Sequence, residues 1–476
     1  MITALVIFAM AAGGTGSPTI SRPTDHTTER VTHERDAAAA WAARAHVVDG
    51  VRRTPTFARQ MKLSCNVCHM AGFPQLTRFG RLFKLNGYTL SGLSQIVEQI
   101  DSLSRRSLEL SPIPGLSMAA IIDATSLNTP PRGTAKTTAD FPQQLSLFFG
   151  GEIAPRLGGL AQLTYSDQTG RIGIDNTDIR FASHLSLRNR DVLFGVTLHN
   201  NPTVQDVWNT APAWSYPFVS ATAGPRPMAS TLIDGGLAQS VLGLGGYALY
   251  DNLIYAELSG YTSAPQGPRI SADSGATNTL RDVAPYWRVA LQNRQGPSYL
   301  MIGAFGLSAN LYPTGLTGLT NHYADVGVDA QADRPFGQRR VILRGSWIHE
   351  RQTLAASINA LPATADNGVN TLSSFRASAT FAPNDLSSFT LGYFSTTGSS
   401  DARLYAPGET TGSRTGRPDT EGTTGEVTLS PWLNVRIGLQ YTMYQRFNGA
   451  SSAYDVTNGR AARNNNTLML YTWFAF

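Results

Sequence analysis

The sequence predicts an all-β protein in which about 16 antiparallel strands close into an outer-membrane β-barrel, preceded by a small α-helical segment. Charged residues make up only 15% of the 476 residues, against about a quarter in soluble globular proteins. No apolar run reaches the ~18 residues of a membrane-spanning helix. Short segments that alternate polar and apolar residues instead indicate strands that cross the bilayer. The net charge of +5 is modest and no Lys/Arg tract is concentrated, so nucleic-acid binding is not indicated.

The strands lie in residues 111–476, which we interpret as the barrel domain. Their approximate cores are residues 115–127, 142–154, 157–166, 177–187, 190–200, 236–250, 252–263, 285–295, 297–309, 323–334, 338–351, 371–382, 385–397, 421–430, 432–446 and 466–476. Tight turns are expected at Pro155-Arg156, Arg188-Asn189, Asp251, Gln295-Gly296, Pro335-Phe336-Gly337, Pro383-Asn384 and Pro431. Longer loops are expected at residues 128–141, 167–176, 201–235, 264–284, 310–322, 352–370, 398–420 and 447–465. Short and long connections alternate, as in outer-membrane barrels with short periplasmic turns and long external loops.

The alternation within each strand predicts which side chains face the lumen. Val326 and Val328 alternate with Asp325, Gly327 and Asp329, so the valines are expected to face lipid. An Arg side chain in the middle of the lipid face costs about 2–4 kcal/mol. Five strand arginines are therefore predicted to point inward: Arg180, Arg288, Arg344, Arg376 and Arg436.

Both ends of the chain carry features of export to the outer membrane. Residues 1–17, with the apolar run Ile2–Ala12, are interpreted as a signal peptide, although no basic residue precedes Arg22. Residues 18–50 form a polar linker that we expect to be disordered in part. The last strand is aromatic and alternating and ends at Phe476, which looks like the signal read by the barrel-assembly machinery.

The motif Cys65-Asn66-Val67-Cys68-His69 has the C-x-x-C-H pattern of c-type haem attachment. Two thiols at this spacing can add to the two vinyl groups of one haem, and the adjacent imidazole can then bind the iron axially. The chain has only two cysteines, so a second C-x-x-C cannot complete a four-cysteine zinc site. No βαβ pattern surrounds the motif, as a thioredoxin-like site would require. The sequence therefore predicts one haem c, covalently attached through Cys65 and Cys68 with His69 as an axial ligand, in a haem domain at residues 51–110.

The residues that follow the motif predict a short helix with two different faces. Its apolar face, which a haem needs, consists of Leu76, Phe79, Leu82 and Phe83. Arg78, Arg81 and Lys84 step along another side, where they could pair with haem propionates or lumen carboxylates, or remain solvated. The candidate carboxylates are Glu152, Asp178, Glu257, Asp325 and Asp329. A haem unit of ~40 residues is too small to bury its own core, so we expect it to plug the lumen.

The sixth ligand of the haem iron is not fixed by the motif. Met70 is adjacent to His69 and badly placed to reach the opposite face of a haem. The remaining candidates are Met118, His184, Met61, His46 and His199, of which Met118 on the first strand and His184 are preferred. A methionine ligand would raise the reduction potential relative to a second histidine.

The combination of this haem segment with a barrel resembles the outer-membrane monohaem cytochrome–porin fusions, a family that includes the iron-oxidising outer-membrane cytochromes of Fe(II)-oxidising bacteria. The resemblance is carried by Phe57–Gln60, Cys65–His69 and Phe73–Tyr88, and extends to residues 201–217 of an expected long external loop. It implies that the haem accepts an electron from extracellular Fe(II) and passes it to a periplasmic cytochrome or copper protein.

Three functions remain open at the level of the sequence. The first is the one that the resemblance implies, a haem-dependent Fe(II) oxidase that conducts electrons inward. The second is a conduit that delivers electrons outward to an external acceptor. The third is a solute porin in which the haem segment acts as a gate. Because ferric products are insoluble, the electron must cross the ~30 Å apolar layer while the iron stays outside, which favours the first.

Overall fold

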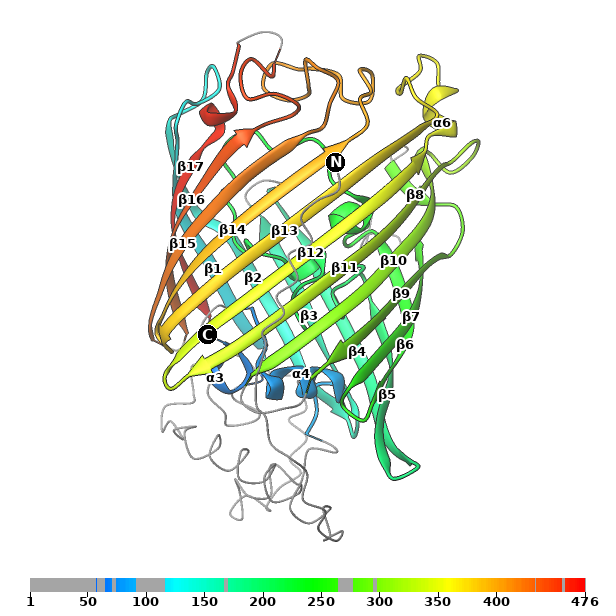
Figure 1. Cartoon of the computed structure of the whole chain (residues 1–476), viewed down its shortest axis with the longest axis vertical. Coiled ribbons are helices and arrows are strands. Elements are labelled where there is room, and N and C mark those ends of the chain that lie inside the picture. Colours follow the sequence, from blue (N-terminus) through cyan, green and yellow to red (C-terminus); the bar gives the residue numbers. More distant parts are fainter. Residues whose placement is uncertain are drawn as a thin grey trace, which may run out of the picture.

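The computed structural model describes residues 57, 65–70, 74–90, 116–166, 170–263, 277–293, 298–432, 434–455 and 459–475. Within these residues, seventeen strand segments form one antiparallel sheet that closes on itself (Figure 1). The predicted signal peptide, the linker to residue 50 and the terminal Phe476 lie outside the described residues. No helix in the described part of the chain is long and apolar enough to cross a membrane.

The sheet consists of β1 (Leu116–Leu127), β2 (Thr137–Ala154), β3 (Leu157–Ser166), β4 (Arg171–Leu187), β5 (Arg190–His199), β6 (Val241–Tyr250), β7 (Ile254–Ser263), β8 (Thr277–Leu280), β9 (Ala284–Gln292), β10 (Tyr299–Thr314), β11 (Asn321–Phe336), β12 (Arg339–Thr353), β13 (Val369–Asn384), β14 (Ser387–Gly398), β15 (Thr420–Trp432), β16 (Val435–Arg446) and β17 (Thr467–Ala475). The helical segments are α3 (Cys65–Cys68), α4 (Arg78–Leu85), η2 (Pro212–Trp214), η3 (Leu232–Gly236), α6 (Ala355–Ile358) and η4 (Ala462–Asn465).

The first and last strands close the barrel. β1 pairs antiparallel with β2 on one side and with β17 on the other, where Ala119 is opposite Ala475. β8 and β9 both pair with β10, so together they form one crossing and the barrel has 16 strands. The predicted strand number is confirmed. β8 is a difference in detail, because residues 277–280 were expected to belong to a loop.

The faces of the strands follow the predicted alternation. Val326 and Val328 are 51% and 47% exposed on the outer surface, while Asp325 and Asp329 are buried inside. The five predicted inward arginines all make contacts inside the barrel or are buried there. Large apolar side chains such as Leu258 and Leu391 cover the outside, which gives the apolar belt of an outer-membrane barrel.

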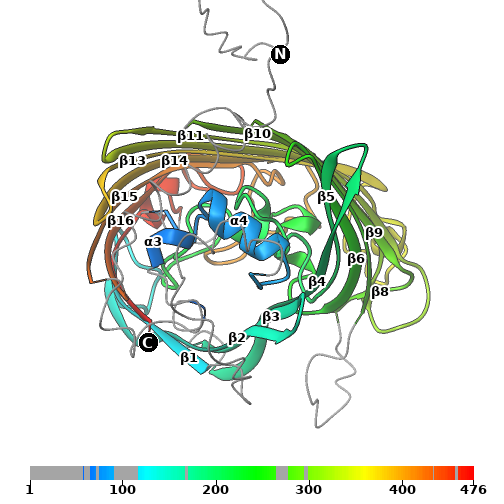
Figure 2. The ribbon, with the colours of Figure 1, turned by 90° about the horizontal axis from the view of Figure 1, so that it is seen from below.

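The two ends of the barrel differ, as expected for an outer-membrane protein. Tight turns gather at the lower end in Figure 1, and the long loops lie at the upper end. At the turn between β4 and β5, Arg188 and Asn189 both have positive φ, as a two-residue type I′ hairpin requires. Short turns face the periplasm in such barrels. The segment with α3 and α4 lies inside the ring at this end, as Figure 2 shows from below.

The connection between β5 and β6, residues 200–240, folds into the lumen, and we call it the inward segment. Its side chains of Val207, Trp208 and Ile233 are buried. The backbone N–H groups of Leu232 and Ile233 donate to the inward carboxylates of Glu350 and Asp325. The long loop predicted at residues 201–235 is present between the external ends of β5 and β6, but it folds into the lumen, which was not predicted. The segment carries apolar side chains that need burial, and strand carboxylates satisfy its backbone.

Candidate functional site

The haem-attachment motif is held by a tight hairpin between α3 and α4. The N–H of Met70 donates to the carbonyl of Gln75, and the N–H of Thr77 donates to the carbonyl of Cys68, both at 2.9 Å. Thr77 is the N-cap of α4, since its Oγ1 accepts from the N–H of Gly80 at 3.1 Å. The same hydroxyl donates to the carbonyl of Val67 at 2.5 Å. One side chain thus begins α4 and ties it to α3.

His69 is oriented by the loop that follows the motif. Its Nδ1 lies 3.3 Å from the carbonyl oxygen of Pro74, and because a carbonyl only accepts, Nδ1 carries the proton. Burial lowers the pKa of His69 to about 4, against the opposing effect of the carbonyls of Pro74 and Gln75. The ring is therefore neutral at pH 7 and its lone pair lies on Nε2. A carbonyl that fixes the tautomer in this way is typical of histidines that ligate metals.

An aromatic cluster lies beside the motif on the α4 side. Phe57 stacks on Tyr88 with ring centroids 5.4 Å apart, and Phe83 packs edge-on against both rings. Phe79 stacks on Phe83. Phe57 comes from a part of the chain well before the helix, and the helical pattern alone did not identify it or Tyr88. The cluster provides the flat apolar surface that a porphyrin needs.

The end of α4 is anchored to the barrel wall and the inward segment. Leu85 packs in one buried cluster with Trp208 and Tyr247, and the hydroxyl of Tyr247 donates to the Leu85 carbonyl at 2.6 Å. The hydroxyl of Tyr88 donates to Asp178 at 2.7 Å. The segment with α3 and α4 therefore lies in the lumen through specific contacts, as predicted.

The basic residues of α4 do not pair with wall carboxylates, contrary to one of the sequence-based alternatives. Lys84 Nζ donates to two backbone carbonyls of the inward segment, of Val204 at 2.6 Å and of Asp206 at 2.9 Å. Arg81 lies 3.9 Å from the ring centroid of Tyr299, and Arg78 is exposed. Burial, together with nearby positive charge, lowers the pKa of Lys84 to about 7.

The wall carboxylates are instead used by the barrel itself and by the inward segment. Asp178 pairs with Arg180 at 2.8 Å, and Glu257 accepts from Gln205 at 2.7 Å. Asp325 accepts from the backbone of the inward segment. Glu152 is exposed near a short turn. The buried carboxylates accept from these other donors, and one oxygen each of Asp325 and Asp329 is left without a hydrogen-bond partner.

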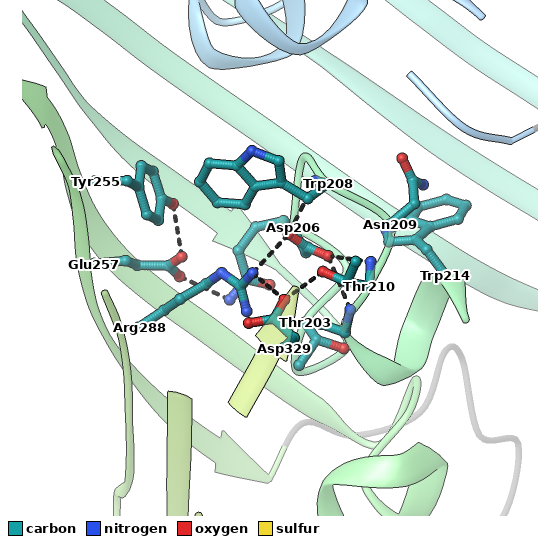
Figure 3. Close-up of polar contacts among 12 residues, drawn as sticks. Thr203, Asp206, Trp208, Asn209, Thr210, Trp214, Tyr255, Glu257, Arg288 and Asp329 are labelled. Carbon is teal, nitrogen blue, oxygen red and sulfur yellow. Dashed lines mark hydrogen bonds and ion pairs between the residues drawn. The ribbon is translucent and has the colours of Figure 1, made fainter. Parts of the chain in front are cut away.

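A buried ion cluster fastens the inward segment to the wall (Figure 3). Arg288 lies 2.6 Å from Asp329 and 3.4 Å from Asp206 of the inward segment. Asp206 also accepts from the backbone N–H groups of Trp208 and Thr210, each at 3.0 Å. Burial opposes ionisation of Asp206, but the Arg288 guanidinium and the backbone donors outweigh it and lower its pKa. The alternation of the strands predicted that Arg288 and Asp329 face the lumen, but their pairing with Asp206 could not be predicted, because the three residues are far apart in the chain.

A cavity of about 1380 Å³ opens beside the motif and is lined by Cys68, His69 and Met118, among others. Of the two preferred sixth-ligand candidates, only Met118 is among the described residues that line it. The ring nitrogens of His184 face Asn86 at 2.6 Å and Asp191 at 3.2 Å, so its contacts lie elsewhere. His199 is bonded to Tyr261 at 2.6 Å. His46 and Met61 lie outside the described residues. Within the described residues, no group of three or more His, Cys, Asp or Glu is placed to hold a metal ion.

No protein-family model and no curated protein matches the chain. Among solved structures, the chain is similar to the outer membrane channel DcaP of Acinetobacter baumannii, with 13% identity over 76% of this chain and 96% of that chain and a TM-score of 0.45. It is also similar to an anion-selective porin from Comamonas acidovorans, with 13% identity over 76% and 99% of the two chains and a TM-score of 0.43. OmpT of Vibrio cholerae in its trimer form has 10% identity over 76% and 98%, with a TM-score of 0.42.

Proposed function

We propose that this chain is an outer-membrane monohaem cytochrome that transfers electrons between the cell exterior and periplasmic carriers, with extracellular Fe(II) as the donor. Haem c would be attached through Cys65 and Cys68 and ligated by His69. When bound, it would supply one-electron redox chemistry. A periplasmic cytochrome or copper protein would take up the electron at the short-turn end of the barrel.

The observation that carries this proposal is the position of the motif. A C-x-x-C-H sequence on an exposed tail would say little about transfer across a membrane. Here the motif is tied to α4, and α4 is anchored inside a membrane-spanning barrel through Leu85 and Tyr88. An insoluble ferric product has to stay outside the cell while its electron crosses the membrane. A redox centre within the barrel shortens the distance that the electron must travel through the ~30 Å apolar layer.

The residues around the motif fit a haem. His69 is neutral at pH 7 because its pKa is lowered to about 4, and its lone pair is on Nε2 because Nδ1–H donates to the Pro74 carbonyl. Phe57 and Phe83 offer an aromatic wall. The cavity of about 1380 Å³ exceeds the about 300–1,000 Å³ of ordinary small-molecule pockets. Met118 lines the same cavity, so we propose it as the sixth ligand in preference to His184.

The test is to purify the protein in detergent, identify covalent haem by its spectrum under denaturing conditions, and mix the oxidised form with Fe(II). Rapid appearance of the reduced haem bands is the expected result. A Cys65→Ala, Cys68→Ala double variant should lack covalent haem. A haem that stays oxidised with Fe(II) but is reduced by dithionite would rule out iron as the donor and favour the outward conduit.

A second candidate function is a solute channel with the haem segment as its gate. The large cavity beside α4 is the observation that favours it. Single-channel recording in planar bilayers separates the two functions. Open-porin conductance that does not respond to the redox state of the haem would support the channel, whereas low conductance with Fe(II)-dependent haem reduction would support the cytochrome.

A further inference from the structure

The cavity beside the motif extends along most of the barrel. At the periplasmic end its lining includes Gly337 and Asp385, in short turns next to β12 and β14. At the other end it includes Ser166, the last residue of β3, where the chain enters a long loop. Cys68 and His69 lie on the same cavity. Among the described residues, one continuous space therefore leads from the external end of β3 to the haem-attachment motif.

The external half of this space runs along a polar wall made by β2, β3 and β4. Gln144 donates to the hydroxyl of Ser146 at 3.0 Å, and Gln162 donates to the hydroxyls of Ser146 and Thr164, both at 3.0 Å. The hydroxyls of Ser146 and Thr164 are 2.9 Å apart, and Thr164 donates to Asp175 at 2.9 Å. We call these five residues the polar ladder.

The carboxylate at its end sets the direction of the polar ladder. The Thr164 hydroxyl donates its hydrogen bond to Asp175, so the Ser146 hydroxyl must donate to Thr164. Both hydroxyl dipoles therefore support a negative charge at Asp175. Arg226 also lines the outer part of the cavity, but it comes from the inward segment and not from the ladder strands.

In the external half of the cavity this chemistry suits a small hydrated cation, whereas Lys84, Arg339, Arg340 and Arg436 line the cavity nearer the motif. Amide and hydroxyl oxygens can exchange hydrogen bonds with the water shell of an ion, and one carboxylate attracts the ion without a cluster that would trap it. The β5–β12 side of the lumen offers no equivalent path in the described residues, because Trp208, Ile233 and the Arg288 ion pairs fill it. The polar ladder is thus the polar part of the cavity wall in its external half.

We propose that the passage along the polar ladder is the route by which a small hydrated cationic electron donor reaches the haem from the external end of the barrel. The inference rests on the proposed function. At the end of the passage the donor would give one electron to the haem held by Cys65, Cys68 and His69 and, one unit more positive, would leave outward along the same passage, so that the oxidised product is released outside. No proton or group is transferred.

The first test needs no redox activity. The holoprotein with Ser146→Cys, in lipid nanodiscs, is labelled with methanethiosulfonate reagents of similar size that carry a trimethylammonium or a sulfonate group. The cationic reagent should react faster, by about tenfold, the lower end of electrostatic focusing in a charged cleft. Addition of Asp175→Asn should bring the two rates together. Failure of both reagents to label Ser146→Cys, or equal rates with Asp175 intact, would overturn the proposal.

The second test blocks the passage. Ser166→Cys is labelled with a bulky maleimide, and Ser452→Cys, on an exposed loop outside the cavity lining, is the matched control. The label at Ser166→Cys should slow haem reduction by Fe(II), and by hexaammineruthenium(II), about tenfold or more. The label at Ser452→Cys should change neither rate. Equal rates with and without the Ser166→Cys label would overturn the passage. If Fe(II) fails to reduce even the unlabelled protein, the proposed function falls, while hexaammineruthenium(II) and the first test still decide the route.

Discussion

Replacement of Gly80 by alanine tests how the haem motif is held. Gly80 lies where α4 crosses the backbone of α3. A Cβ atom there would lie 2.2 Å from the carbonyl oxygen of Cys68, whereas ordinary van der Waals contact begins at 3.4 Å. The two segments must therefore separate by roughly 1 Å, and overpacking of this kind costs about 1–3 kcal/mol. That cost corresponds to roughly a 5- to 140-fold shift towards the undocked hairpin.

Hydrogen exchange at the amides of Met70 and Thr77 measures this shift, because each amide donates a 2.9 Å bond within the hairpin. Gly80→Ala should lose protection at both amides by the same factor, and the purified protein should contain less haem. Gly425→Ala is the matched control, since a Cβ at Gly425 meets nothing within 4 Å. Wild-type protection and full haem content in Gly80→Ala would refute the idea that close contact at this glycine positions the motif.

Three further predictions concern neighbouring contacts. Arg288→Met leaves Asp206 and Asp329 buried without their cation, at a cost of about 3–5 kcal/mol. The inward segment should then detach from the barrel wall, and single-channel conductance should rise. An unchanged conductance would contradict this prediction. The pKa of Lys84 is about 7 in the docked segment, against an ordinary value of 10.5. Between these two pH values the undocked segment binds one more proton than the docked one, so docking should strengthen as the pH rises from about 7 to 10.5. Hydrogen exchange against pH should show this slope in the wild type and not in Lys84→Met. Met118→Ala should lower the midpoint potential of the haem, because loss of a thioether ligand lowers it, and an unchanged potential would exclude Met118 as the sixth ligand.

The barrel could be predicted because lipid and lumen impose opposite rules on alternate residues. A strand such as β11 has Val326 and Val328 outside and Asp325 and Asp329 inside, and a shift of one residue would expose both carboxylates to lipid. The turn residues also predicted where strands end. At Arg188-Asn189, for example, both residues have positive φ, as a tight hairpin turn requires. Local sequence contains both signals, and the predicted strands were therefore close to those observed.

The inward segment could not be predicted because its partners are distant in sequence. Ile233 donates to Asp325, 92 residues later, and Lys84 donates to Val204, 120 residues later. A loop of residues 201–235 that lies outside the barrel and one that folds inward have the same length and end points. The one signal in the sequence was the presence of large apolar residues such as Trp208 in this loop, which argues against an exposed loop.

The ranking of haem ligands depended on the same missing information. His184 was a reasonable candidate because it faces the lumen. In the structure, α4 ends next to His184, and Nε2 of His184 lies 2.6 Å from the side-chain oxygen of Asn86. Met118 and His184 could not be distinguished until the position of α4 was known.

The division of the lumen has a consequence for the haem site. The inward segment fills the β5–β12 side and provides the carbonyls that hold Lys84, while the polar ladder on β2–β4 lines the cavity on the opposite side. A haem held by His69 would lie in the cavity that Phe57, Phe83 and the polar ladder line. Solvent access and local polarity both tune reduction potential. The inward segment should consequently set the potential as well as the position of the haem, although it does not contribute an expected ligand.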